Sequence, residues 1–293
     1  MSEPDHIVVI NAGNTRVTAA VVCLKPSPPA LITAVNAQES TGPNGCANLA
    51  EMLRDTVGDA RPSAAVVVNV RPGLGALIET AVAQALGLVA YHVSAADLGP
   101  HRYRTPLTLG PDRVANVLGY RAYCGLVPGI VVDAGTATTF ECIDASGAFV
   151  GGPIAAGLTT ALEGLLTRAP ALPRPEPKDL AGATRLGQGS LDAVAAGALH
   201  GHVALISGLA DRLASDLQAL APAGHATRNP QHARPPDTAS VSAPAQAARR
   251  ILCGGFAATL APFLADTGFE HVPHLTLVGA ATVLGPARKA TML

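Results

Sequence analysis

Two short polar turns that contain glycine could bind phosphate groups. The first is NAGNT at residues 11–15, and the second is DAGTA at residues 133–137; each follows an apolar run. Glycine turns offer backbone N–H groups at close range, and threonine and asparagine side chains add hydrogen bonds. An acid at the head of such a turn can hold a cation directly or through water. Two turns facing each other across a cleft between domains could clamp the β- and γ-phosphates of ATP. Ordinary tight turns are the alternative.

The spacing of the two turns indicates a duplicated domain core. They begin at Asn11 and Asp133, which are 133 − 11 = 122 residues apart. That separation is about the length of one domain. A third glycine turn, at Gly254 and Gly255, could admit the adenosine of the same nucleotide.

Strands must carry these turns, and the apolar patterns predict them. Residues 6–24 favour two strands joined by the first turn, and residues 130–144 favour a second hairpin of the same kind. The patterns also predict helices at 47–57, 74–86, 109–123 and 190–217, strands at 64–70 and 88–93, and a strand, glycine turn and helix over both 250–264 and 274–284. This alternation is typical of an α/β protein.

Length and composition predict a globular chain of two domains. A chain of 293 residues lies near the size at which one core divides, and we expect domains at 1–115 and 116–293. Residues 222–248 are rich in Pro, Ala, Ser and Thr and predict a flexible insertion. Hydrophobic residues make up 48% of the chain and charged residues 14%, and the net charge is -1. A broad nucleic-acid or membrane footprint is therefore not expected.

Cysteines and histidines give no sign of a metal centre. Five cysteines without a C-x-x-C pair favour reduced thiols over a disulfide framework or zinc site. The nine histidines are interpreted as surface or packing residues, and His200 and His202 should point to different sides of their helix. The N-terminus does not have the pattern of a signal peptide, so we expect a cytoplasmic protein.

Five segments in a fixed order resemble one family over nearly the whole chain. NAGNT, LGPDR, DAGTATT, GGPIAAG and CGG together resemble type III pantothenate kinase, a bacterial enzyme of the actin-like ATPase superfamily. The resemblance implies two duplicated actin-like (ribonuclease H-like) ATPase domains with a cleft between them. It implies transfer of the γ-phosphoryl group of ATP to pantothenate, the first step of coenzyme A biosynthesis, with Mg²⁺ and K⁺ or NH4⁺. It also implies a homodimer whose pantothenate pocket is completed across the interface.

The resemblance assigns roles to matching residues. Asp112 would be the base for the pantothenate hydroxyl, and Asp133 would bind the monovalent cation. The implied pantothenate-binding residues are Tyr103, Gly110, Pro111, Asp112, Arg113 and Ser190. The implied nucleotide-binding residues are Asn11, Ala12, Gly13, Asn14, Thr15, Arg16, Val17, Thr18, Thr136, Gly254 and Gly255.

Plainer interpretations exist for four of these residues. Asp112 could be a helix-start acid, Arg113 a solvated helix arginine and Tyr103 a packing residue, and Ser190 could be a helix N-cap.

Several positions depart from the family pattern. The family opens with D-x-G-N-T-x-x-K, whereas this chain has Asn11 for the acid and Thr18 for the lysine, with Arg16 nearby. Ala156 replaces a proline and Glu141 an aspartate. Asparagine keeps an oxygen that can accept from a magnesium-bound water but loses the charge, which predicts weak metal–nucleotide affinity. A pseudokinase that binds ligands or regulates is thus one alternative. Another actin-like kinase or ATPase is a second, disfavoured by the G-P-D-R segment.

Overall fold

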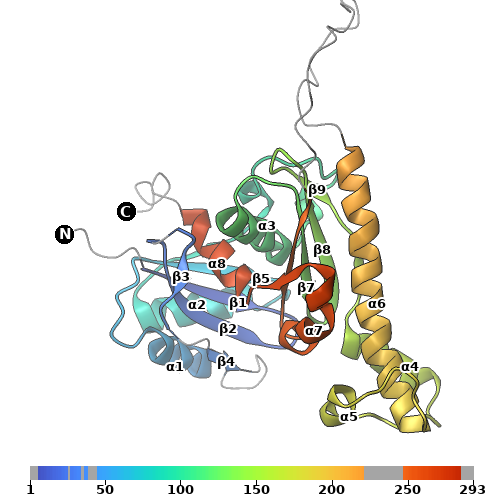
Figure 1. Cartoon of the computed structure of the whole chain (residues 1–293). Coiled ribbons are helices and arrows are strands. Elements are labelled where there is room, and N and C mark those ends of the chain that lie inside the picture. Colours follow the sequence, from blue (N-terminus) through green and yellow to red (C-terminus); the bar gives the residue numbers. More distant parts are fainter. Residues whose placement is uncertain (1–5, 26, 34–35, 39–44, 221–246, 285–293) are drawn as a thin grey trace, which may run out of the picture.

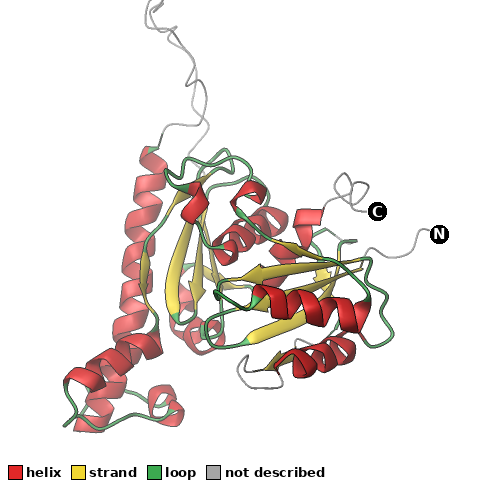
Figure 2. Ribbon diagram, turned by 180° about the vertical axis from the view of Figure 1, so that it is seen from behind, coloured by secondary structure: helices red, strands yellow, loops and turns green. Residues whose placement is uncertain are grey.

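The computed structural model describes residues 6–25, 27–33, 36–38, 45–220 and 247–284. The predicted insertion at 222–248 lies outside the described residues except for its last two positions. Within the described ranges the chain forms two mixed sheets separated and flanked by helices (Figures 1 and 2).

The first sheet has the order β3–β2–β1–β5–β6, and β4 also pairs with β2. Its strands are β1 (His6–Ala12), β2 (Val17–Cys23), β3 (Ala30–Leu31), β4 (Asn36–Gln38), β5 (Ala64–Asn69) and β6 (Ala90–His92). Strands β1 and β2 form the predicted antiparallel hairpin, while β1, β5 and β6 run parallel.

The second sheet repeats this arrangement. Its order is β10–β8–β7–β11–β12, with β9 paired to β8. Its strands are β7 (Gly129–Ala134), β8 (Ala137–Ile143), β9 (Phe149–Gly151), β10 (Ile154–Ala156), β11 (Arg249–Cys253) and β12 (Phe269–His271). Strands β7 and β8 form an antiparallel hairpin, and β7, β11 and β12 run parallel. The hairpins β1–β2 and β7–β8 therefore occupy equivalent places, which confirms the predicted duplication.

Helices cover both faces of each sheet. Helices α1 (Gly45–Val57) and α2 (Gly75–Leu86) pack on the outer face of the first sheet. Helices α6 (Ser190–Ala219) and α7 (Ala257–Leu264) pack on the outer face of the second. Between the sheets lie α3 (Pro111–Cys124) and α8 (Leu275–Ala281), in one core with inward side chains of both sheets. Central strands thus bury both faces, which explains their unbroken apolar runs. Helices α4 (Leu158–Arg168) and α5 (Pro177–Ala181) accompany the start of α6 at one end of the molecule (Figure 1).

The predicted strand and glycine turn after residue 274 are wrong. The segment is helix α8, and Gly279 lies inside it. A Cβ added at Gly279 would fall on the carbonyl oxygen of Ala115, and one at Gly119 would lie 2.6 Å from the carbonyl oxygen of Leu275. The two glycines therefore let α3 and α8 cross with their backbones in close contact. A glycine that permits helix packing has the same letter in the sequence as one that permits a turn.

Gly279→Ala should destabilise the protein by about 1–3 kcal/mol, the usual effect of overpacking a core. The measurement is the free energy of unfolding from urea titration. Gly201→Ala is the matched control, because a Cβ at Gly201 in α6 meets no atom within 4 Å. Replacing that glycine should stabilise its helix by up to about 1 kcal/mol. Equal effects of the two substitutions would contradict the role given to the α3–α8 crossing.

Helix α6 extends over 30 residues and includes the predicted 190–217 segment. Among the described residues it is the one helix whose length and composition would allow it to cross a membrane. Leu199, Ile206 and Ala210 are buried in the core of the second sheet, and core helices pass the same length and composition test.

The interpretation of Ser190 as the N-cap of this helix is wrong. Gly189 occupies that position, and Ser190 is the exposed first residue of the helix.

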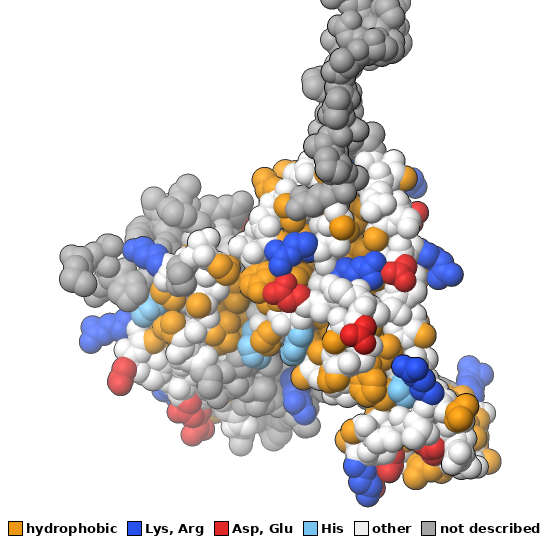
Figure 3. Space-filling model, viewed as in Figure 1, with side chains coloured by type: hydrophobic (Ala, Val, Ile, Leu, Met, Phe, Trp, Pro, Cys, Tyr) orange, Lys and Arg blue, Asp and Glu red, His pale blue; other side chains and the backbone are white. Residues whose placement is uncertain are grey.

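The proposed domain boundary at 115/116 falls inside α3, which contacts both sheets, and α8 packs against β1 although it belongs to the second half of the chain. The division into 1–115 and 116–293 stays a proposal. On the face seen in Figure 3, basic and acidic side chains are interspersed among apolar ones.

Candidate functional site

The two glycine turns meet in the structure. The hydroxyl oxygens of Thr15 and Thr136 lie 3.2 Å apart, across 121 positions of the chain. Each turn is closed by its glycine N–H, with Gly13 donating to the carbonyl of Arg16 and Gly135 to that of Ala137, both at 3.0 Å. The expectation that the turns face each other is confirmed. Their exposed threonines could contact the same triphosphate from two sides.

Asn11 lies at the end of β1 with an unsatisfied oxygen. Its Oδ1 is buried and has no hydrogen-bond partner among the described residues. The strand register places Asn11 opposite Thr18, whose hydroxyl lies 3.5 Å from the Asn11 carbonyl oxygen. The two positions that depart from the family's acid and lysine are therefore cross-strand partners. An unpartnered amide oxygen fits a magnesium-bound water, to which it would act as the acceptor.

Asp133 is the first residue of the second turn and lies next to the third glycine turn, at Gly254 and Gly255. Its Oδ2 accepts a hydrogen bond from Asn116 at 3.0 Å. A Cβ at Gly254, where φ is 95°, would collide with Asp133 Oδ1 and with the backbone of Ala134, so the close approach of the turns needs glycine. Burial raises the pKa of Asp133; the Asn116 hydrogen bond opposes this and the charge of Asp112 adds to it. Two carboxylates near one turn fit a bound cation, which would offset their repulsion.

Asp112 occupies the first turn of α3, where Gly110 is the N-cap and Pro111 the first helical residue. Its Oδ1 accepts from the N–H of Arg113 at 2.8 Å. Burial raises the pKa of this carboxyl above 3.8, and the N–H and charge of Arg113 partly oppose that rise. A helix-start acid accounts for the position. The raised pKa and the nearby second turn also suit a general base.

The raised pKa of Asp112 predicts a pH effect. A base acts when ionised, so kcat/KM should fall as pH decreases through the pKa of Asp112. Because burial moves that pKa upward, the acidic limb of the profile should lie above the ordinary value of 3.8. The measurement is kcat/KM for phosphorylation between about pH 4 and 8. An acidic limb at or below the ordinary value would contradict the assignment.

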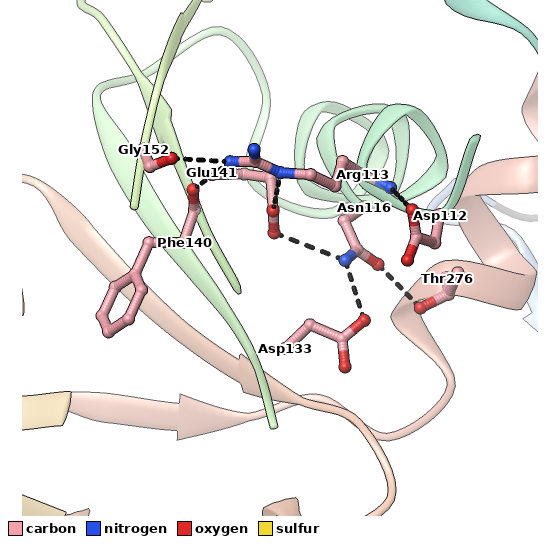
Figure 4. A network of polar contacts seen from close by, with 8 residues as sticks. All are labelled: Asp112, Arg113, Asn116, Asp133, Phe140, Glu141, Gly152 and Thr276. Atoms are coloured by element: carbon pink, nitrogen blue, oxygen red, sulfur yellow. Dashed lines mark hydrogen bonds and ion pairs between the residues drawn. The ribbon is translucent and has the colours of Figure 1, made fainter. Parts of the chain in front are cut away.

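Arg113 points into the protein, so its interpretation as a solvated helix arginine is wrong. The side chain is 5% exposed. Its Nε donates to Glu141 Oε1 at 2.8 Å, and Nη2 donates to the carbonyls of Phe140 and Gly152 at 2.7 and 3.1 Å (Figure 4). The guanidinium thereby ties the start of α3 to β8 and to the segment after β9. Its role toward pantothenate remains a prediction.

Three residues of this network were missed as site residues by the sequence interpretation. Glu141 is fully buried, and burial raises its pKa to about 7 although Arg113 acts in the opposite direction. Asn116 donates to Glu141 and Asp133, and accepts from Thr276 (Figure 4). A charged residue inside the apolar run TTFECI was a usable signal, as was the i, i+3 spacing of Arg113 and Asn116 on one helix. No pattern in the sequence indicated Thr276.

Tyr103 joins this neighbourhood through Phe149. The two rings have centroids 5.4 Å apart, and the Arg113 guanidinium lies 5.6 Å from the Phe149 centroid. Tyr103 is half-buried, so it packs and still presents part of its surface. Tyr103 and Arg113 therefore both contact Phe149, and their common role toward pantothenate stays a prediction.

Ser190 does not join them. It is exposed at the start of α6, beside α4 and α5 and away from α3 (Figures 1 and 2). Among the described residues no hydrogen bond connects it to Tyr103 or to the GPDR segment.

The start of α4 also supports the second turn, which the sequence interpretation missed. Gly157 N–H and the Thr160 hydroxyl both donate to the Thr136 carbonyl, at 3.0 and 2.6 Å. A Cβ at Gly157 would overlap the carbonyl of Gly135.

The packing interpretation is confirmed for His202, which is buried and bonded to the Thr138 hydroxyl at 3.0 Å. His200 instead contacts the Ala183 carbonyl, so the two histidines do point apart.

Known proteins share this sequence pattern. The family model for type III pantothenate kinase matches residues 7–212. Type III pantothenate kinase 1 of Symbiobacterium thermophilum is 32% identical over 220 residues, which cover 72% of this chain and 80% of that protein. Type III pantothenate kinase of Acidobacterium capsulatum is 41% identical over 113 residues, 38% of this chain and 40% of that protein. The chain therefore spans less than half the length of this second relative.

Solved structures share the fold. A Campylobacter jejuni protein provisionally assigned to the Baf family of transcriptional activators aligns with a TM-score of 0.55 at 16% identity, covering 94% of this chain and 96% of that chain. A ROK family glucokinase from Streptomyces griseus, in complex with glucose and AMPPNP, aligns with a TM-score of 0.53 at 13% identity, covering 95% and 98%. The two-domain actin-like ATPase fold is thereby confirmed. With the family match extending over most of the chain and the glycine turns placed together, this chain belongs to the type III pantothenate kinase family.

Proposed function

We propose that this protein phosphorylates pantothenate with ATP, giving 4'-phosphopantothenate in the first step of coenzyme A biosynthesis. The observation that carries the proposal is the meeting of the Thr15 and Thr136 turns, with Asp112 and Asp133 beside the second. Family membership supplies the substrate class.

In the proposed reaction Asp112 accepts the proton of the attacking pantothenate hydroxyl. That oxygen bonds to the γ-phosphorus of ATP as the bond to the β–γ bridging oxygen breaks, and ADP leaves. Donors of the turns at 11–18 and at Thr136 would hold the phosphates, and Gly254 and Gly255 would leave room for adenosine. Tyr103 and the Gly110–Pro111 segment would position pantothenate.

Cations complete the proposed site. Magnesium would neutralise charge on the β- and γ-phosphates when bound with ATP, held through water by Asn11 and otherwise by phosphate oxygens. Asp133 would hold a monovalent cation, K⁺ or NH4⁺. Among the described residues no group of three or more His, Cys, Asp or Glu side chains could hold a metal.

Assembly and location belong to the same proposal. We infer a homodimer, because Ser190 lies apart from the GPDR segment within one chain and would reach pantothenate only from a second copy. The inferred location is the cytoplasm, without a nucleic-acid or membrane partner.

The deciding experiment incubates the purified protein with ATP, Mg²⁺, K⁺ and pantothenate and detects phosphopantothenate by mass spectrometry. Absence of product at high enzyme concentration would reject the proposal. Binding of AMPPNP by calorimetry without turnover would instead favour the pseudokinase, which rests on Asn11 and the missing lysine.

Asn11→Asp should lower the magnesium concentration for half-maximal activity on the order of tenfold, because two unit charges about 4 Å apart interact by about 1 kcal/mol in water and magnesium carries two charges. The measurement is turnover against MgCl2 at fixed ATP. Because Asn11 pairs with Thr18 across the hairpin, the matched variant is Asn11→Asp/Thr18→Lys, which adds the cation and keeps net charge. If magnesium dependence and turnover are unchanged in Asn11→Asp, the interpretation of this position is wrong.

A further inference from the structure

Asn116 lies between the carboxylates of Asp133 and Glu141 and uses its whole side-chain amide. Nδ2 donates to Asp133 Oδ2 at 3.0 Å and to Glu141 Oε2 at 3.3 Å, and Oδ1 accepts from the Thr276 hydroxyl at 2.7 Å (Figure 4). The residue is fully buried. An ionised carboxylate only accepts hydrogen bonds, so the amide nitrogen must face both acids. Thr276 then has to donate to the amide oxygen, which fixes every partner in this cluster.

The cluster joins elements that carry both halves of the site. Asn116 is on α3, Asp133 at the end of β7, Glu141 on β8 and Thr276 on α8. Helix α8 packs against β1, the strand that ends in the first turn, as well as against α3. A continuous path of contacts therefore runs from the first sheet through Thr276 and Asn116 to the acid that heads the second turn.

We propose that Asn116 is a positioning residue that holds one oxygen of Asp133 inside the protein and thereby turns the other toward the cation. Among the described residues no group donates a hydrogen bond to Asp133 Oδ1, and Gly254 and Gly135 border it without side chains. This leaves Oδ1 to a ligand. Thr276 orients the amide of Asn116 and so affects the position of Asp133 indirectly. The inference rests on the proposed function, because the cation site at Asp133 is part of it.

The chemistry of the cluster makes asparagine difficult to replace. Aspartate at 116 has the same shape but would place a third carboxylate against two others and remove both donors. Valine at 276 has nearly the shape of threonine and removes only the hydroxyl, so Oδ1 of Asn116 loses its donor while the two contacts of Nδ2 remain. Thr276→Val is therefore the sharper variant, since Asn116→Asp can also impair folding.

The test compares wild type, Thr276→Val and Asn116→Asp, with Thr56→Val as a matched control. Thr56 is another buried threonine, 2% exposed, whose hydroxyl bonds to the Met52 carbonyl within α1. Potassium is titrated in two assays. The first measures the rise in the thermal unfolding midpoint in the presence of Mg²⁺ and AMPPNP, and the second measures turnover. Each assay gives the potassium concentration at half-saturation. The pantothenate KM and the midpoint without ligands are measured alongside.

In Thr276→Val both half-saturating potassium concentrations should rise about three- to tenfold, as expected for one lost hydrogen bond, with the pantothenate KM unchanged. Asn116→Asp should show a larger rise or no response. Thr56→Val should lower the unfolding midpoint without moving the potassium response. A Thr276→Val variant that loses stability as Thr56→Val does but keeps the wild-type potassium response overturns the inference alone. A wild type without product or potassium response overturns the proposed function and, with it, the positioning of its cation site.

Discussion

Asp112→Asn should lower kcat by about 10²–10⁴-fold, the usual contribution of a positioned general base. The amide keeps the size and an oxygen acceptor for the Arg113 N–H but cannot take the proton of the attacking hydroxyl. Burial raises the pKa of the Asp112 carboxyl, so in wild type its basicity is closer to that needed at neutral pH than an exposed aspartate's. The measurement is kcat under saturating ATP and pantothenate.

Two comparisons separate lost chemistry from lost structure. Binding of AMPPNP by Asp112→Asn should stay within about twofold of wild type, because the proposed nucleotide contacts lie on the turns. Asp59→Asn, a change at an exposed acid after α1, should leave kcat unaffected. Near-wild-type kcat in Asp112→Asn would remove this residue from the role of base.

Arg113→Met should destabilise the protein by about 3–5 kcal/mol, the typical effect of removing one partner of a buried ion pair. Glu141 is fully buried, and its carboxylate would be left with Asn116 and Thr139 as partners and without a countercharge. The carbonyls of Phe140 and Gly152 would lose their donor as well. The measurement is the free energy of unfolding by denaturant titration.

The loss in Arg113→Met should depend on pH in a definite direction. Glu141 already has a pKa raised from 4.5 to about 7 in the folded protein, and removing the guanidinium raises it further. The folded state then holds a proton that the unfolded state releases, so stability declines as pH rises from about 4.5 through the folded pKa. The destabilisation should be larger at pH 8 than at pH 5.

A double variant provides the control for this prediction. In Arg113→Met/Glu141→Leu both charges are replaced by apolar groups, and most of the lost stability should return. A single variant as stable as wild type, or a loss independent of pH, would contradict the account of this pair.

The sequence by itself determined the two hairpins, their parallel neighbours β5, β6 and β11, and the glycine turns that follow β1 and β7. Continuous apolar runs such as residues 64–70 predict strands buried on both faces, and glycine turns end them. These are local signals, because strand burial and turn geometry depend on neighbouring residues. The repeated hairpin pattern, 122 residues apart, predicted the duplication that the equivalent strand orders confirm.

Only the tertiary structure decided which residues support the site. Arg113 has the pattern of an exposed helix residue until β8 provides Glu141 as its partner, 28 positions away. Gly279 was interpreted as a turn glycine, because only the crossing of α3 and α8 requires its missing side chain. Thr276 contacts Asn116 across 160 positions. Such contacts depend on packing between segments that are distant in the sequence, which local periodicity does not encode. The turns, in contrast, depend on the types of a few consecutive residues.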